Sequence, residues 1–179
     1  MQMSITRDRK TKKQTDIRIK SIGDEHRDWL RSRVQEIWQG RYVYTRGIAH
    51  EPADLPGVLA MRDGEVLGVA TYHIKDGECE LVTIDAFEQW GGVGSALIDA
   101  VEDEARKLEC GRMWMVTTND NIDGLRFYQR RGYFICAVHT GAVEESRKQD
   151  PSIPLIGNYG IDIRDEVELE KNLYCWVGW

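Results

Sequence analysis

The 179-residue sequence has only four cysteines and four prolines, and it has no long run of uncharged apolar residues. Cys79, Cys110, Cys136 and Cys175 lie far apart, and no CxxC pair indicates a zinc site or a redox dithiol. No stretch approaches the roughly 20 apolar residues that span a bilayer, and the first 15 residues lack the apolar run of a secretory signal. These absences predict a soluble, cytoplasmic protein with reduced thiols and no bound metal.

Charge is unevenly distributed along the chain. The whole chain has a net charge of −6, but residues 1–20 carry +5 and the remainder carries −11. Phosphate contact needs a basic face, so the acidic body argues against nucleic acid as a partner. The basic arm at residues 1–15 is predicted to be a solvated terminus rather than a binding segment.

Hydrophobic periodicity predicts a single domain over residues 16–173, followed by an aromatic tail at 174–179. The two tryptophans of the tail fit packing either on the chain's own core or across a homodimer interface. Asp-Gly pairs at residues 63–64 and 76–77 supply the left-handed conformations of tight turns, so they predict two hairpins. The strands come first and strand–helix–strand units follow, which favours an α/β (α+β) fold around a mixed sheet. Strands are predicted at residues 16–21, 58–62, 65–75, 78–85, 112–118, 133–139 and 159–172, and helices at 24–39, 93–108 and 121–131.

The ends of the helices carry further signals. Asp24 is the predicted N-cap of the first helix, and Gly111 and Gly132 are predicted to end the second and third. Residues 40–56 have no regular pattern and are predicted to be irregular. Residues 141–158 form a polar stretch with two prolines that leads into the last strand, in which the pattern suggests a bend near Asp165.

The most informative segment is a glycine-rich turn between a predicted strand and a predicted helix, Gln89-Trp90-Gly91-Gly92-Val93-Gly94-Ser95. Its glycines leave backbone N–H groups free to converge on an anion, and the helix N-terminus adds a partial positive charge. The turn lacks the lysine of a P-loop, and Leu97 occupies the third glycine position of a dinucleotide fingerprint. The turn therefore indicates a different phosphate or pyrophosphate ligand, with a tight turn that binds nothing as the alternative.

This turn and a later motif resemble the GNAT superfamily of N-acetyltransferases. The acetyl-CoA signature of that family, Gln/Arg-x-x-Gly-x-Gly/Ala, matches residues 89–94. Residues 121–133 match its later motif of Asn, a small residue three positions on, Phe-Tyr, Gly and an aromatic. The resemblance spans nearly the whole chain and points to a bacterial branch of unknown substrate. It implies the GNAT fold, with a mostly antiparallel sheet of about seven strands flanked by helices.

The resemblance also implies an activity and roles for individual residues. An acetyl group would move from acetyl-CoA to a primary amine by direct attack in a ternary complex; a non-catalytic acyl-CoA-binding module is the alternative. Asn121 would fix the pantetheine arm, and Tyr128 would protonate the departing thiolate. The strand before the turn would pair with the arm as an added strand. The implied cofactor-binding residues are Val82, Thr83, Ile84, Gln89, Trp90, Gly91, Gly92, Val93, Gly94, Ser95, Asn121 and Tyr128.

The general base stays open between Glu80 and Glu78, because the period of two places both on one face of the strand. A solvated hairpin carboxylate is the alternative for each. Asp85, His73 and His50 are weaker candidates. An acidic body attracts cationic acceptors, which favours an amine on a small molecule or on a protein.

Overall fold

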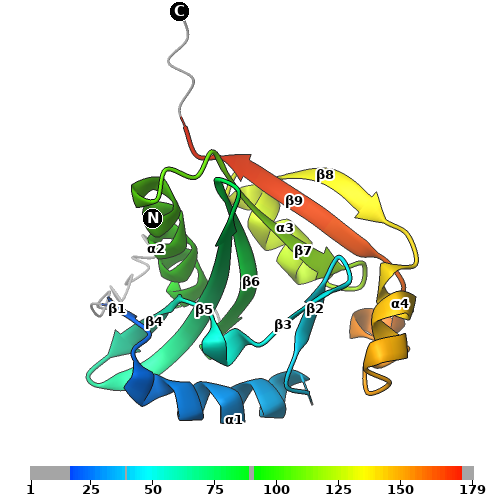
Figure 1. Ribbon diagram of the computed structural model, residues 1–179, viewed down its shortest axis with the longest axis horizontal. Helices are drawn as coiled ribbons and strands as arrows, with labels where there is room; N and C mark the ends of the chain where they lie inside the picture. Colours follow the sequence, from blue (N-terminus) through cyan, green and yellow to red (C-terminus); the bar gives the residue numbers. More distant parts are fainter. Residues whose placement is uncertain (1–16, 39, 89–90, 175–179) are drawn as a thin grey trace, which may run out of the picture.

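The computed structural model describes residues 17–38, 40–88 and 91–174 (Figure 1). The main feature of the fold is a seven-stranded sheet flanked by helices, which confirms the predicted fold class. The strand order is β1-β4-β5-β6-β7-β9-β8. Neighbouring strands are antiparallel except β6 and β7, which are parallel. The strands are β1 (Arg18–Ser21), β4 (Gly57–Arg62), β5 (Glu65–Lys75), β6 (Glu78–Ala86), β7 (Arg112–Thr118), β8 (Phe134–His139) and β9 (Glu166–Asn172).

Two-residue turns connect the antiparallel strands as predicted at Asp63-Gly64 and Asp76-Gly77, where all four φ angles are positive. A third turn of this kind, Arg46-Gly47, joins β2 (Val43–Thr45) to β3 (Ile48–His50). The prediction that residues 40–56 are irregular was therefore wrong. The signal was weak because arginine, unlike asparagine or aspartate, rarely adopts the left-handed conformation.

The helices are α1 (Arg27–Trp38), α2 (Val93–Lys107), α3 (Ile122–Arg130) and α4 (Ala142–Gln149). Asp24 is not an N-cap, because it lies inside a 3₁₀ turn at Asp24–His26 that follows Gly23. Gly111 does not end α2 either. Glu109 takes the left-handed conformation with φ of 58°, and the N–H of Cys110 donates to the Ala105 carbonyl, which closes the helix two residues earlier. Gly132, with φ of +88°, follows α3 as predicted.

One prediction for the C-terminal part was also wrong, the start of the last strand. This strand begins at Glu166 rather than at residue 159, directly after the position where the bend was suggested. The polar stretch before it contains α4. The backbone N–H groups of Arg164 and Asp165 donate to Asn119 Oδ1. A side chain therefore accepts the hydrogen bonds that a neighbouring strand would otherwise accept. Ile163 is buried although its segment is not a strand, and this gave the sequence the apolar pattern of one.

The two faces of the sheet are covered by different helices. Leu97, Ile98 and Val101 of α2 belong to one buried cluster, and Leu30 and Val34 of α1 belong to a second. A bulge in β6 leaves Val82 without a partner on β5, since Thr71 lies opposite Thr83 and Tyr72 opposite Leu81. In the described ranges, no helix is both long and apolar enough to traverse a membrane.

Candidate active site

The parallel strands β6 and β7 pair over a short distance and then part. On β6, only Glu78, Cys79 and Glu80 have partners on β7. The last pair joins Glu80 to Trp114. Figure 1 shows the two strands diverging beyond this point. Val82, Thr83 and Ile84 therefore have no strand beside them on the β7 side within the described part of the chain. That edge of β6 is open to an extended ligand.

A cleft of about 790 Å³ lies between this part of β6, the start of α2 and helix α3. It brings together residues that are about 45 positions apart in the sequence. Gln89 and Trp90 lie outside the described residues, and Val82, Thr83 and Gly91 do not line the cleft. The predicted cofactor residues that do line it are Ile84, Gly92, Val93, Gly94, Ser95, Asn121 and Tyr128.

Gly92 shapes the start of α2. It occupies the N-cap position in the left-handed conformation (φ 80°, ψ 1°), and no side chain caps the helix. The first intrahelical bond runs from the Ala96 N–H to the Gly92 carbonyl at 3.0 Å. The N–H groups of Val93, Gly94 and Ser95 precede it, so they have no acceptor within the helix. These amides and the helix dipole suit an anion.

Asn121 holds the start of α3 against the end of β7. Its Oδ1 accepts the Gly124 N–H at 3.0 Å, and its Nδ2 donates to Thr117 Oγ1 at 2.8 Å. A Cβ at position 124 would lie 2.4 Å from the Asn121 Nδ2, so the capped turn has room only for glycine there. The small residue three positions after the asparagine thus has a steric cause.

Tyr128 lies on α3 and lines the cleft, although its side chain is almost fully buried against Phe127 and Tyr133. Burial raises the pKa of Tyr128 to about 12. The hydroxyl therefore stays protonated at neutral pH and can act as a donor. The structure places it on the same face of the sheet as α2.

Three arginines that the sequence reasoning missed also line the cleft: Arg126 and Arg130 of α3, and Arg131, which caps its C-terminus. Arg126 pairs with Asp123 at 3.0 Å, and Arg131 pairs with Asp99. Arg126 and Arg130 lie one turn apart on the motif helix, and this spacing was the available signal. They add positive charge on the side of the cleft opposite the glycine-rich turn.

Glu80 lies on the other face of the sheet, next to two histidines. Its Oε2 is 3.5 Å from His50 Nε2 and 4.0 Å from His73 Nδ1. Its Oε1 is buried and has no hydrogen-bond partner among the described residues. Burial lowers the pKa of His50, against the opposing effect of the Glu80 carboxylate.

Glu78 has a different environment, although it shares this face. Arg112 holds both of its oxygens, with Nε to Oε1 and Nη2 to Oε2 each at 2.9 Å. Both carboxylate oxygens of Glu78 are therefore occupied by one guanidinium. Asp85 lies 3.6 Å from the Arg33 guanidinium on the α1 side.

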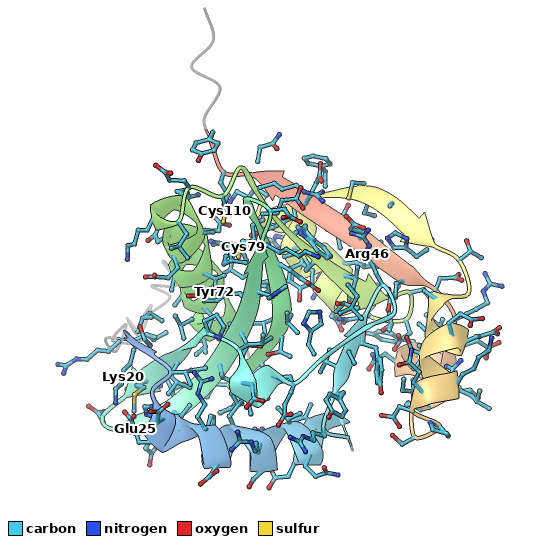
Figure 2. The ribbon with its side chains drawn as sticks, viewed as in Figure 1. Lys20, Glu25, Arg46, Tyr72, Cys79 and Cys110 are labelled. Atoms are coloured by element: carbon cyan, nitrogen blue, oxygen red, sulfur yellow. The ribbon has the colours of Figure 1, made fainter. Side chains whose placement is uncertain are left out.

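The β2–β3 hairpin covers the Glu80 side, and β2 contacts β6 (Figure 1). Arg46, labelled at the hairpin turn in Figure 2, lies 5.2 Å above the Trp114 ring. The backbone N–H of Arg46 donates to Glu166 Oε2 at 2.9 Å. Burial raises the pKa of Glu166. Sequence reasoning named neither Trp114 nor Glu166, because no local pattern connects either residue to Glu80.

The sequence model of a family described as "Acetyltransferase (GNAT) family" matches residues 20–133. The chain belongs to this family. The matched range contains both motifs, β6 with Glu80, and the β2–β3 hairpin. Glu166 lies beyond it.

This GNAT-family chain is similar to curated proteins and to solved structures. Two uncharacterised proteins of Bacillus subtilis strain 168 match it. YdhI is 40% identical over 119 residues, covering 66% of this chain and 74% of its own. YxbD is 39% identical over 111 residues, covering 62% and 70%.

Solved structures share the fold. A Bacillus subtilis acetyltransferase in complex with CoA has a TM-score of 0.64 at 24% identity, over 89% of this chain and all of the other. A GNAT acetyltransferase from Elizabethkingia anophelis with acetyl-CoA bound has a TM-score of 0.66 at 20% identity, over 87% and 97%.

Proposed function

We propose that this GNAT-family protein is an N-acetyltransferase that moves an acetyl group from acetyl-CoA to a primary amine. The observation that carries the proposal is the parting of β6 and β7 after Glu80, beside a turn of free amides. The CoA and acetyl-CoA complexes of the two solved structures with this fold support the choice of carrier.

In this proposal the cofactor occupies the α2–α3 side. The N–H groups of the turn around Gly92 bind the pyrophosphate, and Arg126 and Arg130 contribute charge toward the phosphates. The pantetheine arm pairs with the open edge of β6 from Val82 to Ile84, like an added strand. Asn121 acts by holding α3 in place.

The acceptor approaches from the β2–β3 side. Glu80 accepts a proton from the amine, whose nitrogen attacks the thioester carbonyl carbon. The C–S bond then breaks, and Tyr128 donates to the sulfur of the leaving thiolate. Glu80 suits the role better than Glu78, because Arg112 occupies both oxygens of Glu78. Buried Glu80 and Glu166 favour an acceptor that carries positive charge.

The test has two steps. Thermal unfolding is first measured with acetyl-CoA, where a ligand at 100 times its Kd adds about 2.7 kcal/mol to stability. Thiol release is then followed with a panel of polyamines, amino acids, aminoglycosides and peptides, with acetyl-CoA alone as the control. We expect stabilisation and release that depends on the amine. Stabilisation with no amine-dependent release would indicate a binding module, and no stabilisation by any acyl-CoA would overturn the proposal.

A further inference from the structure

His50, His73 and Glu80 form a compact group of potential metal ligands. They come from β3, β5 and β6, and one ligand atom from each lies within 4.8 Å of the others. The centroids of the His50 and His73 imidazole rings are 5.5 Å apart. The side chains of His50 and Glu80 are only 6% and 5% exposed.

Two polar atoms of this group are buried without a hydrogen-bond partner among the described residues. They are His50 Nε2 and Glu80 Oε1. Buried polar atoms are nearly always satisfied, and leaving one unpaired is destabilising by about 1–3 kcal/mol. A cation between the rings and the carboxylate would give His50 Nε2 a partner, and Glu80 Oε1 would gain one where the carboxylate binds the cation through both oxygens.

We propose that His50, His73 and Glu80 form an exchangeable Zn²⁺ site. Imidazole nitrogen and carboxylate oxygen bind zinc at about 2.0–2.2 Å, which puts two ligands of one tetrahedral ion roughly 3.3 Å apart. The Glu80 Oε2 is already 3.5 Å from His50 Nε2 and 4.0 Å from His73 Nδ1. The His73 side chain is 40% exposed, so its ring is free to make the remaining movement. Three protein ligands leave a fourth position open.

Charge separates this site from a second group of potential ligands, Cys136, Glu168 and Glu170. Arg112 pairs with Glu170 and lies 3.7 Å from Glu168, so its guanidinium already neutralises these carboxylates and repels a cation. No lysine or arginine pairs with Glu80 in the described ranges. Zinc therefore favours the His50–His73–Glu80 group.

Binding is tested on the full chain after removal of metal with a chelator. Zinc affinity is measured by competition with a chromophoric chelator, and Co²⁺ serves as a spectroscopic probe of nitrogen and oxygen ligation. We expect one equivalent of zinc, with affinity reduced about tenfold or more in His50→Ala and in His73→Ala. His26→Asn is the matched control, because it removes an imidazole elsewhere and keeps an acceptor for the Gly23 N–H.

Two outcomes would overturn the site. One is unchanged zinc affinity in His50→Ala and His73→Ala, and the other is loss of zinc in Cys136→Ser with retention in the histidine variants. Should the buried His50 variant fail to fold, the half-exposed His73 position still decides the matter, with unfolding monitored by circular dichroism.

A consequence rests on the proposed function: zinc would occupy the lone pairs with which Glu80 accepts the amine proton. Zinc should then inhibit acetyl transfer reversibly, and His73→Ala should need more zinc for the same fractional inhibition. The acetylated amine is measured by mass spectrometry, since the thiol of released CoA itself binds zinc. Binding at the site without inhibition would overturn this consequence. Absence of any acetyl transfer would contradict the proposed function and leave the binding result standing.

Discussion

The two sides of the candidate site are built in different ways. The cofactor side consists of short continuous segments, the turn at residues 91–95 and helix α3, and it presents backbone N–H groups and arginines. The acceptor side combines His50, His73, Glu80 and Glu166 from different strands, and it presents buried carboxylates and imidazoles. The comparison teaches that an anion can be recognised by local backbone geometry, whereas proton transfer needs side chains that only tertiary folding brings together.

The difference also has an electrostatic aspect. Arg126 and Arg130 lie on an exposed rim, where solvent and salt screen their charges. Glu80 is buried, so its interactions are screened much less. Substitutions on the acceptor side should therefore change the rate of chemistry, and substitutions on the cofactor side should mainly change affinity for acetyl-CoA.

The largest expected effect is that of Glu80→Gln. Loss of a general base should lower kcat by about 10²–10⁴-fold and remove the acidic limb of the rate–pH profile. Glu78→Gln is the matched control: it should have a much smaller effect, because Arg112 already holds Glu78. A larger loss in Glu78→Gln than in Glu80→Gln would reverse the assignment.

Tyr128→Phe should come next, with kcat lower by about tenfold to 10²-fold and little change in the KM for acetyl-CoA. The physical reason is loss of the donor to the leaving thiolate. Steady-state kinetics at neutral pH measures the effect, and Tyr133→Phe serves as a comparison because its hydroxyl donates to Glu102 instead. An undiminished kcat would rule out the hydroxyl as the donor.

A side chain in the left-handed conformation is strained by about 1–2 kcal/mol, so the free turn of Gly92→Ala should relax away from the conformation that binds. Restoring that conformation on binding should weaken the affinity for acetyl-CoA by roughly fivefold to thirtyfold. The space beside Gly92 is open, so strain rather than a clash is tested. Gly64→Ala is the matched control, with φ of +88° and equally open space in the β4–β5 turn, which does not line the cleft. Isothermal titration measures the affinity for acetyl-CoA. Equal weakening in both variants would show that the effect does not arise from the conformation of the glycine-rich turn.

Arg130→Ala should raise the Kd for acetyl-CoA only about twofold to fivefold at low salt, and the difference should shrink at high salt because exposed charges are screened. Arg41→Ala, which removes a guanidinium paired with Glu51, should leave this Kd unchanged. Titrations at two ionic strengths test the prediction. A salt-independent effect would mean that Arg130 acts through packing.

The smallest effect should be on stability. Burial raises the folded-state pKa of Glu166 above its usual value of 4.5, so its contribution to stability is present below that value and is lost as pH rises through the folded pKa. Glu166→Gln should therefore raise Tm by a few degrees at neutral pH and by less in mild acid. Thermal unfolding at both pH values checks this, and a lower Tm at neutral pH would contradict it.

The predicted elements were confirmed where local chemistry controls the backbone. The Asp-Gly hairpins, strand β7 at Arg112–Thr118 and the end of α3 at Gly132 all follow from turn residues and periodicity. The β2–β3 hairpin was missed because its turn is Arg-Gly. The start of β9 was misplaced because the Asn119 side chain, distant in sequence, binds the preceding segment.

The candidate site divides in the same manner. The glycine-rich turn and residues 121–133 were found as contiguous motifs, and Asn121 with Gly124 has a local steric explanation. Glu80 and Glu78 were equivalent by strand periodicity. They became different only when folding placed Arg112 beside Glu78 and the two histidines beside Glu80.

By itself, the order of amino acids determined the family motifs, the two Asp-Gly hairpins and the anion-binding turn, because each depends on residues within about a dozen positions of one another. Tertiary structure decided where β6 and β7 part, which carboxylate is free of an arginine, and that His50 and His73 meet Glu80. These features depend on register between strands and on packing across them, and such long-range contacts leave no periodic trace in the chain.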